Sequence, residues 1–262
     1  MDIKVGKTTA FATTGGRAFD KAQPTIVFIH GAGLDRSVWS LQTRYFAYHG
    51  YNVLAIDLPG HGRTPGPVLR TIPETADWIM AMLDALDIEA AALVGHSLGS
   101  LVAFDAAARY PNRVTALALL GATVPMGVTD LLLNAAKEND HSAIDMVTLW
   151  GHSQDGQNGA SRAPGLWMTG GSVSLLERSA PGILHAGLNA ANEYRDGLEL
   201  AGNITCPTLL VLGARDAMTP AKAAKPLADA IPGARTIILA GCGHMMMAEQ
   251  PDEVLDALIS VL

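Results

Sequence analysis

Short apolar runs alternate with amphipathic segments along most of this chain. Six runs of five to eight residues are apolar on both faces and are bounded by Gly, Pro or charged residues, which is typical of strands buried in a parallel sheet. These predicted strands are Thr25–His30, Asn52–Asp57, Ala91–His96, Val114–Gly121, Thr208–Gly213 and Thr236–Ala240. Amphipathic segments predict helices at Pro73–Asp87, Leu98–Tyr110, Ala221–Ile231 and Asp252–Leu262. The alternation predicts an α/β fold, with a mostly parallel sheet flanked by helices.

One segment, from Thr123 to about Gly202, interrupts this alternation. It contains no clear strand, and its middle, Gly151–Gly171, is rich in glycine. We expect a mostly helical insertion with a pliable middle. Residues 1–121 and 203–262 are then the core, and residues 122–202 are a helical cap over a site. A peripheral helical layer without a role in substrate binding is the alternative.

The composition narrows the class of protein. A chain of 262 residues buries about three quarters of its unfolded surface, so it needs no disulfide or metal support. Hydrophobic residues make up 49% and charged residues 16%, which excludes disordered, fibrous and coiled-coil proteins. The longest apolar runs, such as Thr115–Leu120, are far too short to span a membrane, and residues 1–24 contain no apolar block typical of a secretion signal.

The charge and the cysteines add two exclusions. A formal net charge of −7 argues against nucleic acid or an anionic membrane surface as a partner. The two cysteines cannot form a disulfide framework, and no zinc-type spacing is present. Cys206 precedes one strand and Cys242 follows the next, so we expect free thiols about 20 Å apart, with Cys242 exposed to solvent. A cytoplasmic protein is the expectation, and the oligomeric state stays open.

The sharpest chemical motif is Gly95-His96-Ser97-Leu98-Gly99, a G-x-S-x-G. Chance alone produces this pattern in roughly one sequence in ten of this composition, so its context decides. It lies between a predicted strand and a predicted helix, where Gly95 and Gly99 allow a tight turn. Such a turn exposes the Ser97 hydroxyl above the carboxyl ends of the strands, where open α/β sheets place their sites.

A serine hydroxyl becomes a nucleophile only when a base takes its proton. Of the eight histidines, His244 follows the last predicted strand and therefore emerges at the same edge as Ser97. His30 and His61 lie in glycine-rich turns and are interpreted as residues that shape loops. His96 neighbours Ser97, but its side chain is expected to point away. His244 is therefore the candidate base.

The base needs an acid that orients it. Asp216 directly follows the strand Thr208–Leu212 and reaches the same edge. The other position at which this architecture carries the acid follows Val114–Leu120, but there the chain reads Gly121-Ala-Thr. Asp57 also ends a strand and is the alternative, although it is better explained as pinning a tight turn.

The oxyanion of a tetrahedral intermediate needs backbone donors. The N–H of Leu98, the residue after the nucleophile, is one candidate. The second is the N–H of Ala32, in the tetrapeptide His30-Gly31-Ala32-Gly33 after the first long strand. A turn role for this tetrapeptide is the alternative.

Five motifs together resemble the α/β-hydrolase superfamily over almost the whole chain. They are HGAG at His30, DLPGHGRT at Asp57, GHSLG at Gly95, GARD at Gly213 and GCGHMMMAEQPDEV at Gly241. The resemblance implies that Ser97, Asp216 and His244 form a catalytic triad in the order Ser, Asp, His. Ser100 departs from the many relatives that carry a second Gly after the elbow.

The reaction that these residues favour is acyl transfer to water. A serine nucleophile argues against the dehalogenases and epoxide hydrolases of the family, which carry Asp there, and no metal or organic cofactor is required. The substrate is expected to be a small molecule, a small or medium apolar carboxylic ester. Candidate pocket residues, each of which could instead be core, are Gly31, Leu34, Trp39, Leu131, Leu132, Met146, Trp150, Leu166, Trp167, Met168, Met245 and Met246.

Several alternatives share the triad. A lactonase comes next after an esterase. A C–C bond hydrolase is less favoured because its relatives usually follow the catalytic His with Trp, where Met245 stands here. A cofactor-free perhydrolase and a receptor for a small ligand stay open. Turnover of any ester distinguishes the enzymes from the receptor.

Overall fold

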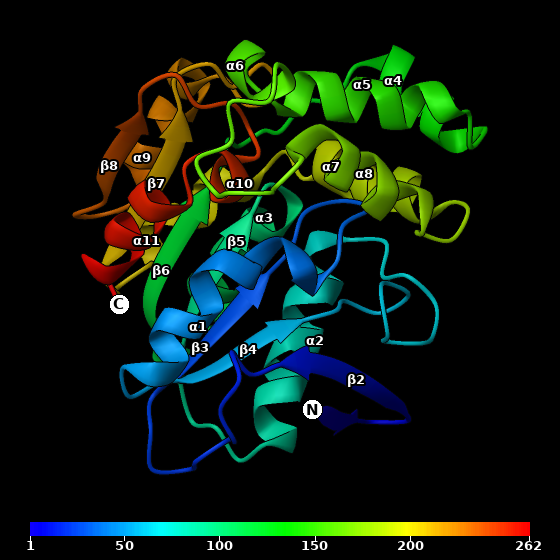
Figure 1. The fold of residues 1–262 in the computed structure, drawn as a ribbon. Coiled ribbons are helices and arrows are strands. Elements are labelled where there is room, and N and C mark those ends of the chain that lie inside the picture. Colours follow the sequence, from blue (N-terminus) through cyan, green and yellow to red (C-terminus); the bar gives the residue numbers. More distant parts are fainter.

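Eight strands form one sheet in the order β1-β2-β4-β3-β5-β6-β7-β8 (Figure 1). The computed structural model describes residues 1–262. The strands are β1 (Asp2–Val5), β2 (Thr8–Thr13), β3 (Thr25–Ile29), β4 (Asn52–Ile56), β5 (Ala91–His96), β6 (Val114–Leu120), β7 (Thr208–Gly213) and β8 (Arg235–Leu239). All six predicted strands are therefore present, each to within one residue at both ends.

The six strands from β3 to β8 are parallel, and β2 joins them antiparallel through β4. After β3 the chain adds β4 on one side and then crosses to add β5 on the other side. The strand order thus reverses between β3 and β5, and ligands of open α/β sheets bind at such a point. The loop that begins at His30 and the turn at Ser97 follow these two strands.

Helices cover both faces of the sheet. In the core they are η1 (Arg36–Trp39), α1 (Ser40–Tyr48), α2 (Ile72–Ala85), α3 (Leu98–Arg109), η2 (Pro111–Arg113), η4 (Ala221–Ala224), α9 (Lys225–Ala230), α10 (Met246–Glu249) and α11 (Pro251–Ile259). Helices α2 and α3 pack together on one face, whereas α1 contacts α10 and α11 on the other (Figure 1). No helix combines the length and the apolar character needed to cross a membrane.

The two faces of the sheet build two separate apolar clusters, because successive side chains of a strand point to opposite sides. In β3, Val27 and Ile29 belong to the cluster under α2 and α3, whereas Ile26 and Phe28 belong to the cluster under α1 and α11. All five residues of β3 are buried. The continuous apolar runs in the sequence reflect this burial on both faces.

Between β6 and β7 the chain forms only helices. They are α4 (Asp130–Lys137), α5 (His141–Gly151), α6 (Gln154–Gln157), α7 (Met168–Glu177), α8 (Ile183–Glu193) and η3 (Gly197–Asn203). Helices α4 to α8 lie together beyond the end of the sheet to which the arrows of β7 and β8 point (Figure 1). The predicted helical insertion is therefore present, and the stretch from Asn158 to Trp167 has no regular element.

Besides helices α1 and α10, which no pattern predicted, three features differ from the predictions. The hairpin β1–β2 was not predicted because its short strands carry few apolar residues and form the sheet edge. Strand β8, predicted as buried, is largely exposed, with Ile238 at 57%, because it is the opposite edge strand. Both cysteines are free as predicted, but Cys242 is fully buried rather than exposed, because its side chain belongs to the apolar cluster under α1 and α11.

Candidate active site

Ser97 lies at a strained turn between β5 and α3. Its φ of 53° and ψ of −120° lie in a region that non-glycine residues rarely adopt. The turn brings backbones so close that a Cβ at Gly99 would lie 2.3 Å from the Ile29 carbonyl oxygen, and one at Gly95 would lie 2.1 Å from the Gly99 carbonyl oxygen. These two positions therefore require glycine.

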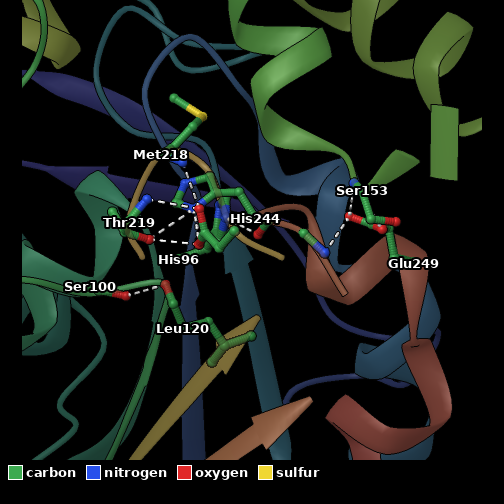
Figure 2. Close-up of polar contacts among 10 residues, drawn as sticks. His96, Ser100, Leu120, Ser153, Met218, Thr219, His244 and Glu249 are labelled. Carbon is green, nitrogen blue, oxygen red and sulfur yellow. Dashed lines mark hydrogen bonds and ion pairs between the residues drawn. The ribbon is translucent and has the colours of Figure 1, made fainter. Parts of the chain in front are cut away.

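The Leu120 carbonyl at the end of β6 anchors this turn. It accepts a hydrogen bond from the Ser97 N–H at 2.9 Å. The buried Ser100 hydroxyl lies 2.9 Å from the same oxygen and 2.7 Å from the Gly95 carbonyl oxygen (Figure 2). Ser100, the departure from the common family pattern, thus adds a polar tie between the turn and the neighbouring strand.

His244 and Asp216 form a buried pair. His244 Nδ1 lies 2.7 Å from Asp216 Oδ2, and both residues are at most 6% exposed. Burial raises the pKa of Asp216, but the adjacent His244 imidazole and the donors of Thr219 outweigh it and hold the pKa below its usual value. Because Nδ1 donates to the carboxylate, Nε2 is left with a lone pair, and it has no hydrogen-bond partner.

Thr219, which the sequence patterns did not single out, is a third member of this cluster (Figure 2). Its hydroxyl donates to Asp216 Oδ2 at 2.7 Å and lies 3.1 Å from His244 Nδ1. The N–H groups of Thr219 and Met218 donate to Asp216 Oδ1 at 2.7 and 2.8 Å. The signal that could have found Thr219 is its place three residues after Asp216, where a turn returns its N–H to the carboxylate.

Two buried side chains hold the loop that carries His244. His96 Nε2 donates to the His244 carbonyl at 3.0 Å, and the two rings pack with centroids 4.7 Å apart. Glu249 accepts from the Gly243 N–H at 3.0 Å and also from the Ser153 N–H, which belongs to the helical segment (Figure 2). The same carboxylate thus joins this loop to residues between α5 and α6.

The loop after β3 lies against Ser97. The Ala32 N–H donates to no protein acceptor, and the Leu98 N–H is the first of α3 and has no partner within the helix. The Leu58 N–H donates to His30 Nε2 at 3.1 Å, so the opposite ring nitrogen carries the proton and donates to the Gly31 carbonyl at 2.9 Å. This bond fixes the Gly31–Ala32 peptide and hence the direction of the Ala32 N–H.

Asp57, the alternative acid, has a different role. Its carboxylate is fully buried, pairs with the Arg36 guanidinium at 2.6 Å, and accepts from the N–H groups of Arg36 and Arg63. Three donors, two from Arg36 at the start of η1 and one from Arg63, thus converge on it, and none is His244. Asp57 pins the turn after β4, as its sequence context indicated.

Two cavities meet at Ser97 and His244. The first, of about 30 Å³, extends toward α5 and α7, and the second, of about 90 Å³, extends toward α4. Both are lined by Ala32, Ser97, Leu188, Met218 and His244. The walls are mostly apolar, and neither contains Arg or Lys. Across the chain, no group of three or more His, Cys, Asp or Glu side chains could hold a metal ion.

Comparison with known proteins decides the family. A family model described as "alpha/beta hydrolase fold" matches residues 24–251. The chain belongs to the α/β-hydrolase family.

Two enzymes illustrate the sequence relatives of this α/β-hydrolase. It is 34% identical over 249 residues to the pimeloyl-[acyl-carrier protein] methyl ester esterase of Aromatoleum aromaticum, in an alignment that covers 88% of this chain and 95% of the relative. It is 24% identical over 239 residues to the (E)-2-((N-methylformamido)methylene)succinate hydrolase of Acinetobacter baylyi, with 89% of this chain and 88% of the relative covered.

Among solved structures, the enol-lactonase from Burkholderia xenovorans LB400 aligns with a TM-score of 0.88 at 23% identity, covering 99% of this chain and 98% of that chain. An esterase from Thermogutta terrifontis gives 0.84 at 21% identity, covering 99% and 96%. At these identities the likeness shows the fold alone. The predicted fold, family and enzyme class, a serine hydrolase, are thereby confirmed.

The predicted pocket residues of this α/β-hydrolase occupy different places. Gly31, Leu34 and Met245 line the first cavity, and Trp150 and Leu132 line the second. An outer groove of about 390 Å³, which shares Ser172 and Met245 with the first cavity, is lined by Leu166 and Met168. The other five predicted residues line none of these three spaces. Trp39 and Met246 are fully buried in the core, and Met146 of α5 packs against α4. The side chains of Leu131 and Trp167 are 66% and 73% exposed. Helical spacing fixes which residues share a face but not which face meets the site, so the sequence could not separate these groups.

Two buried histidines, His30 and His61, are expected to make the stability of this α/β-hydrolase depend on pH. Burial lowers the pKa of His30 to about 4 and that of His61 to about 3, and their rings pack 4.8 Å apart. Below pH 6.5 these histidines bind protons in the unfolded chain but not in the folded chain. The free energy of unfolding therefore decreases as the pH is lowered, until the pH reaches the pKa values of the folded state. Between pH 6.5 and 5 we expect a loss of about 2 kcal/mol for each of the two.

Urea unfolding midpoints at pH 7.5, 6.5 and 5 measure this loss. In His61→Gln the midpoint should fall less steeply with pH than in the wild type. Equal pH slopes in the two proteins would contradict the prediction.

Proposed function

We propose that this α/β-hydrolase cleaves small to medium apolar carboxylic esters through an acyl-enzyme intermediate on Ser97. The observation that carries the proposal is the junction of two apolar cavities at Ser97, beside a buried His244–Asp216 pair whose free Nε2 faces no other partner. An ester has an acyl group and an alcohol group on either side of the carbon that Ser97 attacks, and the two cavities provide one space for each group. Their small volumes favour short acyl and alcohol groups.

In the first half-reaction Ser97 Oγ attacks the ester carbonyl carbon while His244 Nε2 takes the hydroxyl proton. The carbonyl oxygen becomes an oxyanion, which the N–H groups of Ala32 and Leu98 stabilise. Asp216 holds His244 in the required tautomer and stabilises the imidazolium. When the tetrahedral intermediate collapses, the C–O bond to the alcohol breaks and His244 returns its proton to the leaving oxygen.

In the second half-reaction a water molecule attacks the acyl carbon and gives a proton to His244. The acid leaves as the Ser97 Oγ–C bond breaks, and Ser97 regains its proton from His244. The structure records no hydrogen bond between Ser97 Oγ and His244 Nε2, which agrees with catalytic hydrogen bonds that tighten only when substrate binds.

We also propose that residues 122–202 form a cap that shapes both cavities, over a core of residues 1–121 and 203–262. Side chains of α5, α7 and α8 line the first cavity, and those of α4, α5 and α8 line the second. Close packing supports this role, because a Cβ at Gly187 of α8 would lie 2.8 Å from the Ala32 Cβ.

The ester proposal is tested by initial rates on p-nitrophenyl esters from acetate to dodecanoate. We expect kcat/KM to be highest for short or medium acyl chains and to fall for dodecanoate. A fluorophosphonate should label Ser97 covalently, as detected by peptide mass. Absence of turnover across the series in folded protein would overturn the proposal and direct assays to lactones, C–C bond cleavage, perhydrolysis and ligand binding.

Gly121 allows a further prediction. It directly follows β6 with φ +61°, and a Cβ there would lie 2.9 Å from His244 Cε1 and 3.0 Å from Nδ1. Gly121→Ala should therefore displace the imidazole and lower kcat by about 100-fold, and the positive φ should cost about 1 kcal/mol of stability. Esterase rates and thermal unfolding measure both effects.

The matched control is Gly202→Ala. A Cβ at Gly202 would meet no atom within 4 Å, the φ of this residue is not positive, and it lines neither cavity, so both readouts should stay near wild type. Equal activities in the two variants would argue against the assigned position of His244.

A further inference from the structure

A polar pair stands inside the apolar cavity next to Ser97. His152 follows α5 and Ser172 lies in α7, and both line the first cavity together with Ser97 and His244. His152 is 3% exposed and Ser172 is 8% exposed. The proposed reaction uses neither side chain, although buried polar groups are costly unless they have a partner.

The hydrogen bonds of His152 define what it offers to a ligand. Its Nδ1 lies 2.8 Å from the Thr148 carbonyl, which can only accept, so Nδ1 carries the proton. Burial holds the pKa of His152 below its usual value, so the ring is neutral near pH 7 and Nε2 carries a lone pair. Nε2 is therefore an acceptor on the wall of the cavity.

The second half of the pair is incompletely bonded. Ser172 Oγ lies 3.5 Å from His152 Nε2, well beyond the ~2.8 Å of a strong hydroxyl hydrogen bond. Together the two groups present one acceptor and one hydroxyl that both donates and accepts. A group that donates to Nε2 and accepts from Ser172 satisfies both at once.

The charges around the pair select against an anion. The walls of the cavity contain no Arg or Lys. The carboxylate bonded next to the pair is Glu249, which accepts from the N–H of Ser153, the residue after His152. A substrate carboxylate here would be buried without a cation and close to a like charge, whereas a neutral hydroxyl would be fully bonded.

We propose that His152 and Ser172 form a recognition site for a neutral hydroxyl group on the part of the ester that occupies this cavity. The hydroxyl donates to His152 Nε2 and accepts from the Ser172 hydroxyl. This inference rests on the proposed ester hydrolysis at Ser97. It assigns the enzyme a preference for hydroxy esters over plain esters and over esters that carry a free carboxylate.

The test compares kcat/KM for methyl esters of matched chain length. One set carries a hydroxyl at carbon 3, 4, 5 or 6 of the acyl chain, one is unsubstituted, and one ends in a carboxylate. We expect at least one hydroxy ester to exceed its unsubstituted match by about 10-fold or more, and the carboxylate esters to be slowest. The ratio of kcat/KM for the hydroxy ester to kcat/KM for its unsubstituted match is unaffected by any substitution that changes both values by the same factor.

Ser172→Ala should reduce this ratio to about 1. The matched control is Ser174→Ala, because Ser174 lies on the same helix, is exposed, and lines neither cavity, so the ratio should stay at the wild-type value. Ser172→Thr, which keeps the hydroxyl, should retain part of the preference. A ratio near 1 for every hydroxyl position in the wild type, or an unchanged ratio in Ser172→Ala, would overturn the inference.

A binding measurement separates this inference from the ester proposal. Calorimetric titration of Ser97→Ala with the same esters should show tighter binding of the preferred hydroxy ester than of its unsubstituted match. If the wild type hydrolyses no ester while this preference persists, ester hydrolysis fails and the recognition site stands. If esters are hydrolysed but binding shows no preference, the recognition site fails alone.

Discussion

Replacing Ser97 with alanine is expected to lower kcat for esters by about a million-fold, because losing the nucleophile of a triad removes covalent catalysis altogether. The remaining turnover would come from substrate binding and from the oxyanion donors Ala32 and Leu98. The measurement is kcat on the best p-nitrophenyl ester, with enzyme concentrations high enough to detect the residual rate.

The fold should survive this change. Ser97 Oγ makes no hydrogen bond in the structure, and alanine occupies a positive φ about as well as serine. Thermal unfolding within about 2 °C of the wild type would show that the lost rate is chemical. A decrease of less than about 100-fold would mean that another residue supplies the nucleophile. Ser174→Ala, on the exposed face of α7, is the matched control for a serine-to-alanine substitution outside the site, and its kcat should equal that of the wild type.

Replacing Asp216 with asparagine should lower kcat by about 10,000-fold. Four donors converge on this carboxylate: the N–H groups of Met218 and Thr219, the Thr219 hydroxyl and His244 Nδ1. An amide accepts at only one oxygen, so its NH2 group would face donors. His244 then takes the other tautomer, with the proton on Nε2, and cannot accept the Ser97 proton.

The comparison with Asp57→Asn sharpens this test. Asp57 is also fully buried, but its partners are Arg36 and the Arg63 N–H rather than His244. Breaking a buried ion pair should destabilise the protein by about 3 kcal/mol while the folded fraction keeps kcat within about 10-fold. If Asp57→Asn instead lost more activity than Asp216→Asn, with both proteins folded, the acid assigned to the triad would be wrong.

The residues that hold the site together illustrate what sequence patterns miss. Ser97, Asp216 and His244 could be chosen because each directly follows a predicted strand, and carboxyl ends of parallel strands share one edge. Thr219 and Glu249 carry no such mark, although one bonds Asp216 and the other ties the His244 loop to the helical segment. The bond from Glu249 to the Ser153 N–H joins segments 96 residues apart, which no local pattern encodes, whereas Thr219 is marked only by its place in the turn after Asp216.

The sequence by itself determined the six parallel strands, most of the flanking helices and the edge at which the chemistry gathers, because burial on both faces and tight turns leave local signatures in residue type. Tertiary structure alone decided which residues of the helical segment face the cavities. Trp167 lies outside while His152 and Ser172 line the first cavity. The reason is geometric: helical periodicity fixes which side chains share a face, but only packing against the sheet sets which face turns toward Ser97.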